Sequence, residues 1–100
     1  MMRSLKWEDL LDEELRDPAL AAEYLTACME GGDPEVFLLA LRHVARARSG
    51  GLAQLALDTE LNREHLYRML SAKGNPAIRS LAEVLDALGL QLAVKCKGAG

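Results

Sequence analysis

Apolar residues recur along most of this chain with the spacing of an amphipathic helix. Two helix starts are marked by an aspartate before a proline, at Asp17-Pro18 and Asp33-Pro34, because the carboxylate caps the first turn and proline suits the first helical position. Gly31-Gly32 and Ser49-Gly50-Gly51 are expected to end these helices. One face of the first helix is shared by Leu20, Tyr24, Ala27 and Cys28. The predicted buried side of the second helix carries Phe37, Ala40, Leu41, Val44 and Ala45.

Three shorter helices are predicted after Gly51, at about residues 52–58, 62–70 and 78–88. Asn62 is the expected N-cap of the middle one, and Gly89 is expected to stop the last, whose inner face carries Leu81, Leu85 and Leu88. At the other end of the chain, residues 1–16 favour a short amphipathic helix or turn, or a segment that is mobile in isolation. Their helically spaced apolar residues are Trp7, Leu10, Leu11 and Leu15.

The apolar period changes to two over residues 90–96, which is typical of a strand. A single strand has no partner in an otherwise helical chain, and an unpaired strand edge favours pairing with another chain. We therefore expect this segment to pair with its equivalent across a dimer axis, or with a strand elsewhere. A flexible apolar tail is the alternative.

Length and composition favour one small helical domain, since half of the 100 residues are apolar and only 4% are aromatic. We expect an acidic segment over residues 1–16 and a folded domain over residues 17–100. Cys28 and Cys96 have no metal-ligand spacing and are expected to be free thiols in a reducing cytoplasm. Neither a cofactor site, a membrane span, a secretory signal nor an enzyme's nucleophile–base pair is expected.

The net charge of −3 conceals two halves of opposite sign: residues 1–40 carry −7 and residues 41–100 carry +4. The basic half is suited to phosphate, and the acidic half to a basic protein, although both patterns also occur on ordinary solvated helices. Arg42, Arg46 and Arg48 are expected to be such a solvated helix end.

The two short helices at 52–58 and 62–70 have the lengths and connection of a helix-turn-helix. Ala56 supplies a small residue where the helices cross. Leu52, Leu55, Leu61, Leu66, Met69 and Leu70 are placed to anchor the pair. Arg63, Glu64, Tyr67 and Arg68 are then left on the outer side of the second helix. This side is predicted to enter the major groove of duplex DNA.

Residues 38–94 resemble the addiction-module antidote (antitoxin) family, a branch of the lambda-repressor-like DNA-binding domains, and the match as a whole covers about residues 17–95. The resemblance rests on Gly32-Asp33-Pro34, Ala40-Leu41, Val44-Ala45-Arg46-Ala47-Arg48, Gln54-Leu55-Ala56, Leu61-Asn62-Arg63-Glu64, Leu66-Tyr67-Arg68, Gly74-Asn75-Pro76 and Leu85-Asp86-Ala87-Leu88-Gly89-Leu90. It implies an all-α, lambda-repressor-like bundle of about five helices with a short C-terminal β-strand. It departs from the family at Glu60, where glycine is usual because the turn adopts positive φ; a side chain there costs about 1 kcal/mol.

The resemblance further implies an antitoxin that neutralises a small toxin of the RelE/ParE type and represses its own operon as a homodimer. The alternatives are a stand-alone helix-turn-helix repressor, a protein-interaction module that has lost DNA binding and, least favoured, an enzyme. On the DNA-binding hypothesis Arg63 and Arg68 pair with guanine, Glu64 accepts from cytosine or orients an arginine, and Tyr67 contacts thymine or phosphate. The remaining DNA-contact candidates are Gln54, Asn62, Lys73, Asn75 and Arg79.

Overall fold

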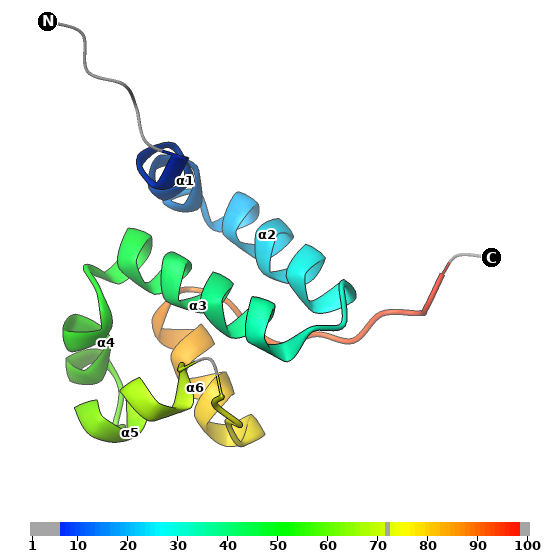
Figure 1. Cartoon of the computed structure of the whole chain (residues 1–100). Helices are drawn as coiled ribbons and strands as arrows, with labels where there is room; N and C mark the ends of the chain where they lie inside the picture. The colour runs from blue at the N-terminus through cyan, green and yellow to red at the C-terminus, as the bar shows by residue number, and fades with distance from the viewer. Residues whose placement is uncertain (1–6, 72, 99–100) are drawn as a thin grey trace, which may run out of the picture.

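The computed structural model describes residues 7–71 and 73–98, and six helices occupy most of that range (Figure 1). They are α1 (Trp7–Leu15), α2 (Pro18–Glu30), α3 (Pro34–Ser49), α4 (Leu52–Asp58), α5 (Arg63–Met69) and α6 (Ile78–Ala87). The all-helical class is therefore confirmed. There are six helices where about five were expected, because the first segment forms a helix that packs onto the rest.

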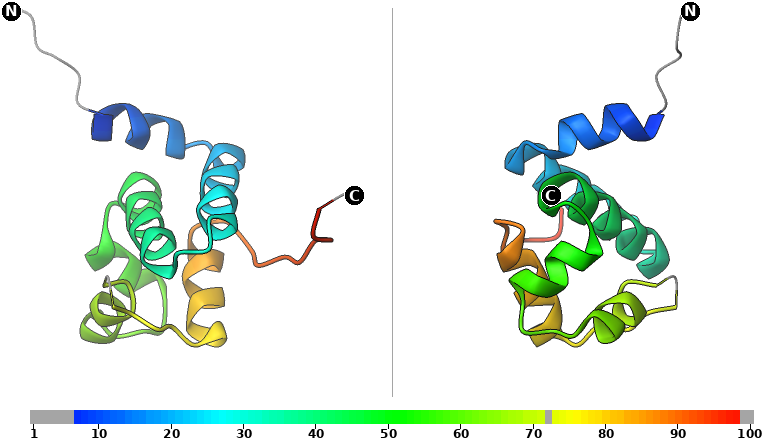
Figure 2. Two further views of the ribbon diagram at one scale, coloured as in Figure 1. Left: turned by 45° about the vertical axis from the view of Figure 1, so that its right-hand side comes forward. Right: turned by 90° about the vertical axis from the view of Figure 1, so that its left-hand side faces the viewer.

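Helix α3 is the central element, with α1 and α2 against one side of it and α4 following at its end (Figures 1 and 2). Its predicted inner face is confirmed. The buried residues of that face are Phe37, Leu38, Ala40, Leu41, Val44 and Ala45. The core is completed by Leu55 of α4, Leu66 of α5, and Val84 and Leu85 of α6.

The face of α2 that carries Leu20, Tyr24, Ala27 and Cys28 is only partly buried, with Tyr24 and Cys28 packed against the core. Ala21 and Leu25 are the buried residues of this helix, whereas Leu20 is 40% exposed and Tyr24 and Cys28 are half-buried. A helix rich in alanine and leucine offers apolar residues on neighbouring faces, so periodicity alone does not decide which face meets α3. The true inner face is about one residue further along the helix.

Helix α1 buries Leu11 and Leu15 in the same core, while Leu10 is 43% exposed. The helical alternative for this segment is thus confirmed for residues 7–15. Residues 1–6 and the side chain of Trp7 lie outside the described residues.

The predicted helix starts are confirmed in atomic detail. Asp17 accepts a hydrogen bond from the backbone N–H of Ala19 at 2.8 Å, and Asp33 accepts one from that of Glu35 at 2.9 Å. The α3 helix ends at Gly50, whose φ of 81° is in the left-handed region, and Gly51 follows with φ of 112°. Because side chains rarely adopt these values, this glycine pair permits the sharp change of direction from α3 into α4.

The arginines at the end of α3 were expected to be solvated. Arg46 is exposed, whereas Arg42 and Arg48 are half-buried and the Nε of Arg42 is buried. Arg46 forms an ion pair with Asp12 of α1 at 2.9 Å. Arg48 donates from Nε to the carbonyl of Leu88 at 2.8 Å and from Nη1 to that of Arg16 at 2.6 Å. These two side chains therefore fasten α1 and the end of α6 to α3.

Residues 90–98 form neither helix nor strand in this chain, so the short C-terminal strand is not seen. The segment leaves α6 in an extended course beside α2 (Figure 2), and Lys95 forms an ion pair with Glu30 at 2.7 Å. An isolated extended segment has no neighbouring strand in this helical chain to complete a ladder. The alternation of residues 90–96 predicted their extended course, but the chain has no second strand among its described residues with which they could pair.

Among the described helices, none combines the length and the apolar character needed to cross a membrane. Over the same residues, no group of three or more histidine, cysteine or acidic side chains is placed to hold a metal ion.

Candidate nucleic-acid interface

Helices α4 and α5 are joined by a turn over residues 59–62 that is organised by a threonine. Thr59 donates from its hydroxyl to the carbonyl of Leu55 at 3.0 Å, and the same oxygen accepts from the N–H of Leu61 at 3.3 Å. Thr59 was not among the residues predicted from the sequence to have a role. A threonine directly after a short helix is the signal that was available, because its hydroxyl readily bonds the preceding turn.

The positive φ expected at Glu60, with its backbone strain, is not found. Within the described part of the chain, no residue other than glycine has a positive φ, and Thr59 at the end of α4 is extended, with φ of −120° and ψ of 174°. The turn therefore passes from α4 to α5 without the left-handed residue that a glycine would supply. Glu60 consequently carries no backbone penalty of this kind.

The inner side of α5 is anchored as predicted. Leu66 and Leu70 are fully buried and Met69 is 4% exposed, and the half-buried Ala56 and Leu61 pack against the same core. Burying one leucine side chain contributes about 1.5–3 kcal/mol. This apolar base fixes the orientation of α5, which on its own would be too short to form a stable helix in water.

The outer side of α5 is entirely polar or amphipathic and faces solvent, since Arg63, Glu64, Tyr67 and Arg68 are all exposed. Arg68 pairs with Glu64 at 3.5 Å, and the two side chains are 71% and 88% exposed. An exposed pair of this kind is worth only a few tenths of a kcal/mol. Both side chains are therefore easily redirected towards another partner.

The start of α5 is capped by Asn62, as predicted: its side-chain oxygen accepts from the N–H of His65 at 2.7 Å. Because that oxygen bonds the helix end, the amide nitrogen is the group that the exposed Asn62 side chain can offer to another molecule. Gln54 of α4 donates to the carboxylate of Asp58 at 3.0 Å, so in this structure it bonds a neighbour in its own helix.

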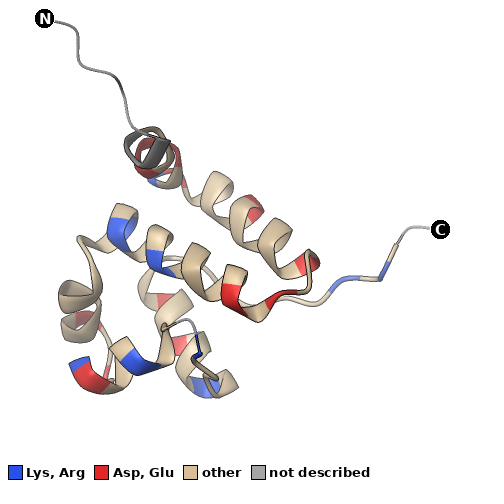
Figure 3. Ribbon diagram, in the orientation of Figure 1, with Lys and Arg blue, Asp and Glu red and all other residues tan. Residues whose placement is uncertain are grey.

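Lys73, Asn75 and Arg79 lie beyond α5, and all three side chains are exposed. Figure 3 shows that the basic segments of α5, of the following connection and of the start of α6 lie at the same end of the molecule. The connection is held close to α5 because Gly74 packs directly against the backbone carbonyl of Met69. The structure thus brings the predicted residues after Leu61 into one region.

Acidic segments of α1 and of the first part of α2 lie at the other end, whereas the acidic connection from α2 to α3 lies beside residues 74–76 (Figure 3). Glu13, Glu14, Asp17 and Glu23 are all exposed at the α1–α2 end. They do not cover the outer side of α5. The basic residues after Leu61 are therefore apart from these carboxylates, whereas Arg46 and Lys95 of the basic half pair directly with Asp12 and Glu30 of the acidic half.

A small polar cluster lies between α2 and α3, away from α5. The Tyr24 hydroxyl is 3.1 Å from Nδ1 of His43, and the two rings are stacked with centroids 6.4 Å apart. Burial, together with the nearby Cys28, raises the pKa of Tyr24 above its ordinary value, and burial alone raises the pKa of the Cys28 thiol. Both groups are thus kept neutral, which suits a packing role between the helices.

These features define an all-helical protein that presents one short, exposed, partly basic helix on an apolar base, with an acidic surface at its other end. Residues 6–96 match the family described as probable addiction module antidote protein, and the chain belongs to that family. A protein of Haemophilus influenzae described only as an uncharacterized protein is 39% identical over 72 residues, which is 72% of each chain. No solved structure matches the chain.

Proposed function

We propose that this protein is an antitoxin that binds and neutralises a small toxin of the RelE/ParE type, and that it represses its own operon by binding DNA through α5 as a homodimer. The antidote family supplies the class of function. The toxin, the DNA contact and the dimer are parts of the proposal. In this role the protein acts by binding, without a reaction step.

The observation that carries the DNA-binding part is the orientation of α5. Its apolar side is sealed against the core by Leu66 and Leu70, so its polar side is presented to solvent in a fixed direction. A short helix held in this way fits the major groove, where Arg63 and Arg68 are suited to the O6 and N7 atoms of guanine. Lys73 and Arg79 are then suited to the flanking phosphates.

A homodimer is proposed because one helix of seven residues contacts few base pairs. Two copies related by a two-fold axis read two half-sites, which raises both affinity and specificity. This arrangement requires a contact surface that leaves α5 uncovered in each copy.

The toxin-binding part rests on family membership and on charge. The exposed carboxylates at the α1–α2 end, among them Glu13, Glu14 and Asp17, are suited to a basic partner protein. Their separation from α5 allows the same molecule to bind toxin at one end and DNA at the other.

The proposal is tested by two measurements on the full chain. The first is the affinity for a duplex that contains the protein's own promoter, measured over a range of salt concentrations, because phosphate contacts make binding weaken steeply with salt. The second is co-expression with the product of the adjacent gene, followed by purification of a complex. Promoter binding without any complex would favour the stand-alone repressor, and a complex without salt-dependent promoter binding would refute the DNA-binding part.

A further inference from the structure

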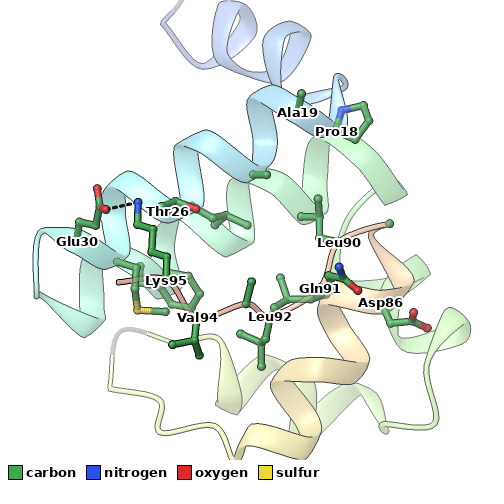
Figure 4. Close-up of a pocket in the computed structure, with 17 residues that line it drawn as sticks. Pro18, Ala19, Thr26, Glu30, Asp86, Leu90, Gln91, Leu92, Val94 and Lys95 are labelled. Carbon is green, nitrogen blue, oxygen red and sulfur yellow. Dashed lines mark ion pairs between the residues drawn. The ribbon is translucent and has the colours of Figure 1, made fainter. Parts of the chain in front are cut away.

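An apolar groove of about 870 Å³ runs between α2 and the extended segment that follows α6 (Figure 4). The buried side chains of Leu25, Phe37 and Leu85 line it from the core, and residues 89–95 form its other wall. The ion pair between Glu30 and Lys95 lies at one end of the groove, and both of its side chains are more than half exposed.

The groove and its outer wall expose apolar side chains to solvent. Met29 is 49% exposed, Leu92 42% and Val94 100%. A contiguous apolar strip with a charged rim is typical of an interaction surface, since the same residues are unfavourable in contact with water. The extended segment that forms the outer wall of the groove leaves the molecule on the side away from α5, as Figures 1 and 2 show.

We infer that a second copy of this chain covers the groove, with residues 90–96 of the two copies running antiparallel about a two-fold axis at Ala93. The inference rests on the homodimer of the proposed function and gives it a surface and a register. Antiparallel pairing gives the N–H and C=O groups of this extended segment the interstrand hydrogen bonds that a single helical chain does not supply. A two-fold contact also needs a self-complementary surface, and the segment has one.

The register follows from the alternation of side chains. With Ala93 on the axis, Leu92 lies opposite Val94 of the second copy, Leu90 opposite its Cys96, and Gln91 opposite its Lys95. Apolar residues then meet only apolar residues, and polar residues meet polar ones.

Other registers are less favourable, including an axis at Leu92, which would place the polar Gln91 opposite the apolar Ala93. An axis at Lys95 sets two ammonium groups directly opposite each other, which is repulsive. An axis at Val94 places Leu90 opposite Gly98 and Ala93 opposite Lys95, so the matching of apolar positions is lost at both. The axis at Ala93 is therefore the register that the sequence favours.

The register is tested by disulfide trapping in the full chain, after Cys28→Ser and Cys96→Ser remove the native thiols. Ala93→Cys in this background is expected to form a covalent dimer under mild oxidation, because only the residue on the axis lies opposite itself. Gln91→Cys is the matched control. Its two copies would be four residues out of register, on the order of 13 Å apart, which is beyond the reach of a disulfide. Ala93→Cys should react at least tenfold faster, and equal rates would overturn the register.

The surface is tested by the mass of the unmodified chain in solution, measured by light scattering without DNA or toxin. The expected mass is that of two chains, and Leu92→Asp with Val94→Asp is expected to halve it while leaving the helical circular dichroism unchanged. A native chain that is monomeric, or a double variant that stays dimeric, would overturn the inference. A monomer that still binds promoter DNA would leave the DNA-binding proposal standing, whereas a trapped dimer without promoter binding would refute that proposal alone.

Discussion

Arg46 of α3 donates two hydrogen bonds to one oxygen of Asp12, from Nη2 at 2.9 Å and from Nε at 3.2 Å, and Nε is also 3.2 Å from the other oxygen. The pair joins residues that are 34 positions apart and holds α1 against α3. It is only partly exposed, with the Asp12 side chain 25% accessible. The acidic first segment is thereby part of the folded body, at least over residues 7–15.

Asp12→Ala is expected to lower the free energy of unfolding by about 0.5–1 kcal/mol, the upper range for a partly exposed pair with good geometry. The measurement is urea denaturation of the wild type, Asp12→Ala, Arg46→Ala and the double variant. The coupling energy from this cycle should be favourable and should shrink as salt is added. Additive losses would mean that the pair contributes nothing to stability.

Arg48 is expected to be more important than Arg46, because its guanidinium bonds two backbone carbonyls on different segments. Arg48→Ala should destabilise the protein by about 2–3 kcal/mol, since a hydrogen bond from a charged donor is worth about 1.5–3 kcal/mol and the exposed bond to Arg16 contributes less than the part-buried bond to Leu88. Arg48→Lys keeps the charge but lacks the planar fork, so it should recover less than half of the loss. A full recovery by lysine in the same denaturation experiment would contradict the two-carbonyl role.

Gly74 has no room for a side chain, because an added Cβ would overlap the backbone of Met69. Gly74→Ala is therefore expected to displace the connection after α5 and to lower the thermal midpoint by several degrees. Gly32→Ala is the matched control: its φ of 83° costs about 1 kcal/mol for a side chain, but open space surrounds it. A smaller loss for Gly74→Ala than for Gly32→Ala would contradict the close approach.

The acidic end of the molecule is testable without removing α1. Deleting residues 1–16 would also remove Leu11 and Leu15 from the core, so weaker toxin binding after that deletion would not separate charge from folding. Glu13→Lys with Glu14→Lys, both at exposed positions, should weaken binding of the adjacent gene's product about tenfold or more, as like charges are brought together.

The neutral pair Glu13→Gln with Glu14→Gln is the graded control for that experiment and should give an intermediate loss. Promoter affinity should not fall in either variant, because these residues lie at the end of the molecule away from α5 (Figure 3). Unchanged toxin affinity in both variants, measured by titration calorimetry, would remove the α1 surface from the toxin-binding site.

The parts of the fold that follow from local chemistry were predictable from the sequence. Asp17 and Asp33 carry their cap signals next to prolines, and the inner face of α3 follows from its strong periodicity. The α4–α5 pair was also placed correctly, because short apolar runs are bounded there by glycines and by Asn62.

Features that depend on distant contacts were not predictable. The inner face of α2 is set by where α3 lies, and α2 offers apolar residues on neighbouring faces. Arg46 and Arg48 look like an ordinary basic helix end, since their partners are 34, 32 and 40 residues away. The course of the turn at Glu60 depends on Thr59, whose hydrogen bonds form only when both helices are in place. The exposure of the residues on the outer side of α5 is now structural fact, while their contact with DNA stays a prediction.

The most direct test of the proposed function is the affinity of the Arg63→Ala, Arg68→Ala double variant for its own promoter. Each arginine paired with guanine is worth about 1–3 kcal/mol, so specific binding should weaken by at least about 30-fold, with an unchanged thermal midpoint. Arg16→Ala with Lys97→Ala removes the same charge away from α5 and should change the affinity less than about threefold. An unaltered footprint in the Arg63→Ala, Arg68→Ala variant would contradict the assignment of α5 to the major groove.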